Sequence, residues 1–281
     1  MSIELSTLLQ RIKDDSVVPY IGFEALRGST NVESGEPIPS DSDSLIIAMN
    51  DGRPMAPKLM YEFPRAAMNL ELKRGRSFVN NFLTRLYGQT KWTRSPFHDW
   101  FATIKPNYVV DINRDTQLQN TYSDTPHTLI HGVARLAYEF RFEIFHYDGS
   151  EYKEIKQELV DPSLPILFKP MGSPVPKANF IASDADYVDY ITELMGGFAI
   201  PDFLKEIRKD KKYLLMGLRL NRDTERMVMA DITYREDKQR GWALISNPNE
   251  KEQRYCDRHG IEIIKADISD LMTLENIAKA S

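Results

Sequence analysis

Short apolar runs alternate with helix-like segments along the whole chain. The runs predict strands at 17–22, 107–112, 142–145, 166–169, 213–218, 242–246 and 261–264. Most of them lack strict apolar–polar alternation, which is typical of strands that are covered on both faces. The first strand ends at Gly22.

Between these runs the apolar positions recur at helical spacing. The pattern predicts helices at 2–15, 59–72, 76–87, from Ser95-Pro96 onward, and at 125–140, 183–195, 201–209, 224–232, 250–259 and 269–278. Strand and helix in turn predict an α/β fold, with a Rossmann-like parallel sheet and helices on both faces.

One long segment interrupts this alternation. Residues 27–57 are rich in Gly, Ser, Pro, Asp and Asn around a single apolar island at 45–48. A loop of that length usually covers something. We therefore expect a single domain over 1–281, with residues 27–95 forming a helical and loop insertion within it.

Composition narrows the class of protein. The chain is 42% apolar and 27% charged, as a globular protein is, and its net charge of −5 provides no basic footprint for nucleic acid. Cys256 is the sole cysteine, which excludes an intrachain disulfide and a Cys-rich zinc module. No apolar run approaches the ~20 residues that span a bilayer, so we expect a cytoplasmic protein without a membrane partner.

Ligands of open α/β sheets bind at the carboxyl ends of the strands, so the strand exits are the places to look for chemistry. Four exits stand out: 22–24, 111–115, 168–174 and 217–223. Each also has a plain structural explanation, since single glycines make tight turns, and Asn113, Asp115 and Asp223 could act as turn or helix-cap residues.

The order and spacing of these exits resemble the SIR2-like (sirtuin-related) family. That family has a strand followed by Gly-Ala-Gly, a Thr-Thr-Asn-x-Asp turn, a strand followed by Lys-x-His-Gly, and a late Gly-x-Ser-x-x-Asp turn. The counterparts here are Gly22-Phe23-Glu24, Asp111-Ile112-Asn113-Arg114-Asp115, Lys169-Pro170-Met171-Gly172 and Gly217-Leu218-Arg219 with Asp223. The resemblance covers residues 8 to 270, and the segment after Arg27 is similar to the helical insertion of bacterial SIR2-like proteins, many of which hydrolyse NAD.

The resemblance implies NAD as the cofactor and no zinc. It assigns catalytic positions to Asn113 and Asp115, and cofactor-binding positions to Gly22, Phe23, Glu24, Gly172, Gly217, Arg219 and Asp223. Phe23 and Glu24, however, place bulk and negative charge where the diphosphate would lie. Met171 occupies the position of the catalytic histidine, and a thioether cannot take up a proton. Arg219 replaces the family's small hydroxyl residue, and we expect it either to hold a phosphate or to form a charge pair with Glu24 across the cleft.

Three functions follow from this reading. The leading one is a non-catalytic binding or regulatory protein with a degenerate NAD site, acting on a nucleotide-like or other anionic ligand, with a protein partner or a second copy of itself. The second is an NAD hydrolase in which Asn113 and Asp115 position water and His127 replaces the missing base. The third is a repurposed cleft that binds another anionic ligand through Arg114, Arg219 and Arg222, or a metal near His127 and His131, which lie four apart on the predicted helix.

Overall fold

A computed structural model describes residues 3–137, 139–234 and 239–280 of the chain. It has a central sheet of nine strands in the order β11-β10-β9-β1-β2-β6-β3-β4-β5. The strands are β1 (Val17–Ile21), β2 (Tyr108–Asp111), β3 (His127–Gly132), β4 (Phe142–Tyr147), β5 (Tyr152–Glu154), β6 (Ile166–Lys169), β9 (Lys212–Met216), β10 (Gly241–Leu244) and β11 (Ile261–Ile264). The short strands β7 (Gly172–Ser173) and β8 (Asn179–Phe180) pair separately.

All strands from β11 to β3 pair in parallel, whereas β4 and β5 add an antiparallel edge. The parallel strands are almost entirely buried, in keeping with their continuous apolar runs. The predicted α/β fold with a mostly parallel sheet is confirmed.

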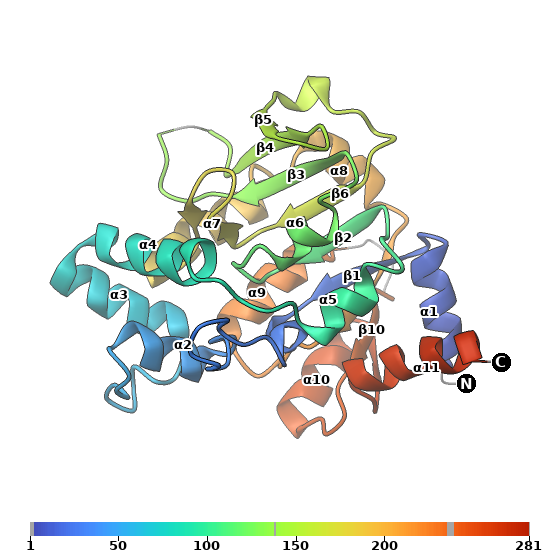
Figure 1. The fold of residues 1–281 in the computed structure, drawn as a ribbon, viewed down its shortest axis with the longest axis horizontal. Helices are drawn as coiled ribbons and strands as arrows, with labels where there is room; N and C mark the ends of the chain where they lie inside the picture. Colours follow the sequence, from blue (N-terminus) through green and yellow to red (C-terminus); the bar gives the residue numbers. More distant parts are fainter. Residues whose placement is uncertain (1–2, 138, 235–238, 281) are drawn as a thin grey trace.

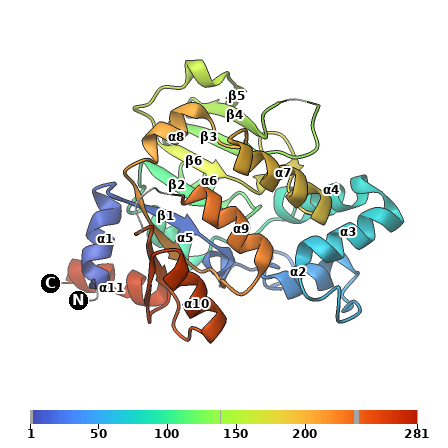
Figure 2. The ribbon, with the colours of Figure 1, turned by 180° about the vertical axis from the view of Figure 1, so that it is seen from behind.

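Helices cover both faces of this sheet (Figures 1 and 2). One face packs against α1 (Leu5–Lys13), α5 (Pro96–Phe101), α6 (Gln117–Thr121) and α11 (Ile268–Ala280). The other packs against α7 (Asp184–Gly196), α8 (Asp202–Ile207), α9 (Asp223–Ile232) and α10 (Glu250–Arg258). Ser2, the first residue of the predicted N-terminal helix, lies outside the described residues.

A third group of helices sits beside the sheet rather than on it. We call residues 42–89 the helical layer: α2 (Ser42–Met49), α3 (Phe63–Arg74), α4 (Arg76–Thr84) and a π-helical turn (Arg85–Gln89). It has its own apolar core, which includes Phe180 of β8 and Ala182 just after that strand. In Figure 1 the layer lies at the side of the molecule, next to the carboxyl ends of the central strands. The apolar island at 45–48, expected in a loop, is helical because it packs into this core.

The helix predicted at 125–140 is wrong. His127–Gly132 is a strand that pairs in parallel with β6 and antiparallel with β4. Its helix-like spacing reflects a short apolar run that cannot be assigned by periodicity, and the pairing partners on both sides decide it. Gly132 fits here because a Cβ would lie 1.9 Å from the carbonyl oxygen of Pro170.

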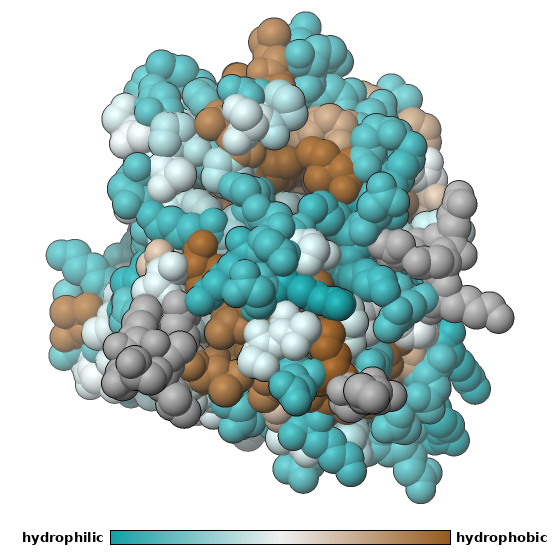
Figure 3. Space-filling model, turned by 90° about the vertical axis from the view of Figure 1, so that its right-hand side faces the viewer, coloured by the Kyte–Doolittle hydropathy of each residue, from teal (hydrophilic) through white to brown (hydrophobic). Residues whose placement is uncertain are grey.

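The face shown in Figure 3 is mostly hydrophilic, with hydrophobic residues showing in separate patches. Within the described residues, no helix has the length and apolar character needed to cross a membrane.

Candidate functional site

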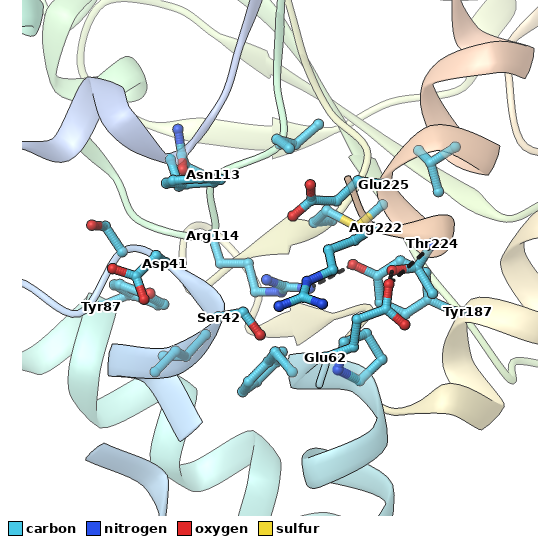
Figure 4. A pocket seen from close by; sticks show the side chains of 18 of the residues that line it. Asp41, Ser42, Glu62, Tyr87, Asn113, Arg114, Tyr187, Arg222, Thr224 and Glu225 are labelled. Carbon is cyan, nitrogen blue, oxygen red and sulfur yellow. Dashed lines mark hydrogen bonds between the residues drawn. The ribbon is translucent and has the colours of Figure 1, made fainter. Parts of the chain in front are cut away.

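A cavity lies between the carboxyl ends of β1, β2 and β6 and the helical layer. The sheet side contributes Phe23, Asn113, Arg114 and Met171, and the helical layer contributes side chains from the starts of α2 and α3. Figure 4 shows Asn113 and Arg114 of the first set, with Ser42 and Glu62 on the side of the helical layer. The cavity itself is small, about 70 Å³, and it shares Phe23, Ser42 and Arg222 with an outer hollow of about 470 Å³ that Arg219 also lines.

Asn113 is held rigidly in the wall of this cavity. Its amide nitrogen Nδ2 donates to Gly22 O at 2.9 Å and to Asp111 Oδ1 at 2.8 Å, and its backbone N–H donates to the same Asp111 oxygen. Asp111 Oδ2 in turn accepts from Lys169 Nζ at 2.6 Å, and both of these side chains are completely buried. A buried ion pair thus fixes the Asn113 amide, and its Oδ1 accepts no hydrogen bond from the described residues.

At the Gly22 turn, backbone N–H groups donate to carbonyl oxygens of the protein itself. Gly22 N–H donates to Met216 O at 2.8 Å, and Glu24 N–H donates to Gly217 O at 3.2 Å. A Cβ on Gly22 would lie 2.4 Å from Gly217 O, so glycine is needed to bring β1 and β9 together. Two of the three amides at 22–24 are therefore already used within the chain.

Glu24 does not line the cavity, whereas its neighbour Phe23 does. Its carboxylate accepts from Arg27 at 2.7 Å, and Arg219 Nε lies 3.8 Å from the same oxygen. The expected Glu24–Arg219 pair is therefore present, but Arg219 is 63% exposed and the pair sits at the rim. Its electrostatic contribution is small because water screens it.

The two remaining glycines of the predicted site have structural reasons of their own. Gly172 and Gly217 adopt positive φ angles of 78° and 68°, which side-chain-bearing residues rarely take. A Cβ at Gly172 would lie 2.0 Å from Asn179 O, and one at Gly217 would lie 2.7 Å from Ile268. Neither glycine lines the cavity.

Asp115 and Asp223 also lie outside the cavity lining. Asp115 is buried, accepts from Gln117 N at 2.7 Å and leaves Oδ2 without a partner. Burial raises the pKa of Asp115 to about 6. Asp223 is exposed and pairs with Arg226.

Asp223 was also a candidate cap of α9, and here the structure differs. The carboxylate of Glu62, from the start of α3, accepts from Thr224 N at 3.3 Å and from its hydroxyl at 3.0 Å. A residue distant in sequence thus caps the helix, because folding brings the helical layer against the first turn of α9.

The cavity is lined by arginine side chains and by carboxylates, and most of these groups are already bonded within the protein. Arg114 donates twice to Ile181 O and once to the Tyr187 hydroxyl, so its guanidinium is largely committed. The guanidinium of Arg222 stacks over the Tyr61 ring and has no hydrogen-bond or ion-pair partner among the described residues. Asp41 is used to cap α2 through Ser44 N at 2.9 Å.

Glu225 is the cavity residue that sequence reasoning missed. It lies three residues after Arg222 on α9, and its Oε2 is buried without a hydrogen-bond partner. Burial and the nearby charge of Glu62 raise the pKa of Glu225 to about 7, against the lowering effect of Arg222 and Arg114. A glutamate on the exit helix has no sequence signal, because only its placement beneath the helical layer distinguishes it from a solvent-facing one.

The histidines lie elsewhere. His127 is the first residue of β3, at the amino end of a strand that pairs in parallel with β6, whereas the cavity lies at the carboxyl ends; its ring is bonded to Thr125 O and the Tyr152 hydroxyl. Burial lowers the pKa of His127 to about 4 and of His131 to about 3. The structure thus separates His127 from Asn113. No group of three or more His, Cys, Asp or Glu side chains in the described part of the chain is arranged to hold a metal ion.

Comparison with known proteins adds one finding. A family model described as a SIR2-like domain matches residues 110–264, which is more than half of the 281-residue chain. A search of curated protein sequences found no match. The matched span contains the Asn113 turn, Met171 and the start of α9.

Proposed function

Because this chain belongs to the SIR2-like domain family, we propose that it binds a small molecule in the cavity beside Asn113 without cleaving NAD. The observation that carries this proposal is Met171. It lies in the cavity wall at the position where the family resemblance places the catalytic histidine, and its thioether cannot act as a general base.

The surroundings of Gly22 support the same proposal. A diphosphate is normally held by free backbone N–H groups and positive helix ends. Here the N–H groups of Gly22 and Glu24 donate to carbonyl oxygens of the chain, and the first turn of α9 is already capped by Glu62. These residues do not fit NAD in a pose that places its diphosphate on the 22–24 turn.

The experiment uses the purified full chain with NAD. We expect no nicotinamide release by chromatography and no micromolar binding by calorimetry. NAD hydrolysis that disappears in Asn113→Ala would overturn the proposal, because it would show that the Asn113 side chain takes part in cleavage.

Glu225 favours a second candidate, a hydrolase of N-glycosidic bonds. A carboxyl group with a pKa of about 7 is suited to accept a proton near neutral pH, and Glu225 shares the cavity with Asn113. In that case the glutamate would replace the missing histidine, since His127 lies at the amino end of β3 and the cavity at the carboxyl ends of the parallel strands. Hydrolysis that persists in Met171→Leu and is lost in Glu225→Gln would identify this candidate, and no hydrolysis of NAD or of nucleosides would exclude it.

A further inference from the structure

The cavity is lined by more hydrogen-bonding groups than the protein itself uses. Asp41 and Glu62 cap helices, and the guanidinium of Arg114 serves Ile181 and Tyr187. Tyr87 donates its hydroxyl to Pro39 O at 2.7 Å. These groups shape the cavity but have little left for a ligand.

Four of the lining groups that have no partner among the described residues are chemically complementary to one another. Arg222 is an unpartnered donor. Glu225 Oε2 and Ser42 Oγ are buried without partners, and the Oδ1 of Asn113 accepts nothing. Leaving buried polar atoms unpaired costs free energy, so a ligand that supplies the matching groups would recover it.

The free groups are of opposite kinds. Arg222 offers a two-pronged donor that matches a carboxylate. The three free oxygens, which include an ionisable carboxyl, call for N–H donors, and an ammonium group has three such donors and no acceptor. No ion pair joins Arg222 to Glu225 among the described residues, so both charged groups of the cavity wall are available to a ligand.

Charge argues against simpler ligands. A purely anionic ligand would be repelled by the carboxylates of Asp41, Glu62 and Glu225, and only Arg222 has a free guanidinium in the lining to attract it. A purely cationic ligand would leave Arg222 unpaired. A zwitterion satisfies both. The rings of Phe23 and Phe63 line the same space and can cover an apolar side chain.

Resting on the function proposed above, we propose that the cavity binds a small zwitterion of the α-amino-acid class, with its carboxylate on Arg222 and its ammonium group on Glu225. Asn113 and Ser42 provide the further oxygens around the ammonium group. The ligand is held by positioned polar groups at one end and by aromatic rings at the other.

Binding of such a ligand is coupled to a proton. Burial, together with the charge of Glu62, raises the pKa of Glu225 to about 7, against the lowering effect of Arg222 and Arg114. An ammonium group favours the ionised carboxylate, so binding near pH 7 releases a proton from Glu225.

The test screens the common free L-amino acids one at a time by thermal shift, followed by calorimetry in phosphate and in Tris. We expect at least one to raise the Tm of the full chain, with an observed binding enthalpy that differs between the two buffers by the number of protons released times the difference in their ionisation enthalpies. Its N-acetyl and α-amide derivatives, which each lack one charge, should bind at least tenfold more weakly.

Two variants locate the site, and one serves as a control. Arg222→Gln and Glu225→Gln should each weaken binding at least tenfold, and Glu225→Gln should abolish the proton release. Glu206→Gln makes the same carboxyl-to-amide change on exposed α8 and should bind normally.

The inference is overturned if no amino acid binds, if an acetylated or amidated form binds as well as the free one, or if both cavity variants retain full affinity. The NAD assay, run in parallel, separates the two proposals. Intact NAD together with no amino-acid binding refutes only the ligand class, whereas NAD cleavage refutes the binding function on which it rests.

Discussion

Replacing Lys169 with methionine tests the buried ion pair beneath Asn113. The ammonium group of Lys169 donates to Asp111 Oδ2 at 2.6 Å, and neither side chain has any solvent exposure. Methionine keeps most of the volume but leaves the Asp111 carboxylate with only the two Asn113 donors on its other oxygen. Removing one partner of a buried pair typically costs about 3–5 kcal/mol.

We therefore expect Lys169→Met to lower the free energy of unfolding by about 3–5 kcal/mol. With a urea m-value of roughly 3 kcal/mol/M, the midpoint of unfolding should fall by about 1 M or more. Asp111→Asn should cost a similar amount, because it leaves the ammonium unpaired. The double variant should cost less than the sum of the two, since both charges are then gone.

The matched control is Lys205→Met, which breaks an exposed pair with Asp202 on α8. Exposed pairs contribute up to about 1 kcal/mol, so the midpoint should barely move. If Lys169→Met is no more destabilising than Lys205→Met, the pair does not hold the Asn113 turn and the reasoning is refuted.

Three further predictions concern single variants in other parts of the fold, and for the first, Asp115→Asn, we expect the free energy of unfolding at pH 8 to rise by about 1–3 kcal/mol. Folding raises the pKa of the Asp115 carboxyl to about 6 from an unfolded value near 4, so the native protein loses stability as the pH rises between these values. In urea titrations at pH 4 the stability difference between Asp115→Asn and the native protein should vanish. Gly172→Ala should cost about 2 kcal/mol more than Gly52→Ala, measured in the same way, since the two share a φ near +80° but only the first meets a backbone oxygen; equal costs would contradict the clash. Asp186→Asn should increase the rate of amide hydrogen exchange in α3 and α4 more than in the sheet. Asp186 forms ion pairs with Arg76 of α4 and with Arg135, and Arg135 also pairs with Glu71 of α3. Unchanged exchange in α3 and α4 would show that these ion pairs do not stabilise the helical layer.

The strand exits could be recognised before the structure was known, and the structure adds how they are used. Asn113, Phe23 and Met171 line one cavity, and Arg219 lies at its outer part. Gly22, Gly172 and Gly217 lie at turns where a Cβ would strike neighbouring atoms, and Asp115 and Asp223 lie outside the lining. A motif position thus predicts the location of a turn, but not whether its side chain points toward a ligand.

The pattern of apolar and polar residues determined the α/β class, most strands and the helices of both faces. A strand that is buried on both sides appears as a continuous apolar run, and a helix that is buried along one stripe appears as apolar positions at helical spacing. Only the tertiary structure decided that 127–132 is a strand, that Glu62 caps α9, and that Glu225 and Arg222 share a cavity with Asn113. Strand pairing, long-range capping and the burial of a charged side chain depend on which distant segments meet. Those contacts, rather than the neighbours along the chain, set the dielectric surroundings and hydrogen-bond partners of each group.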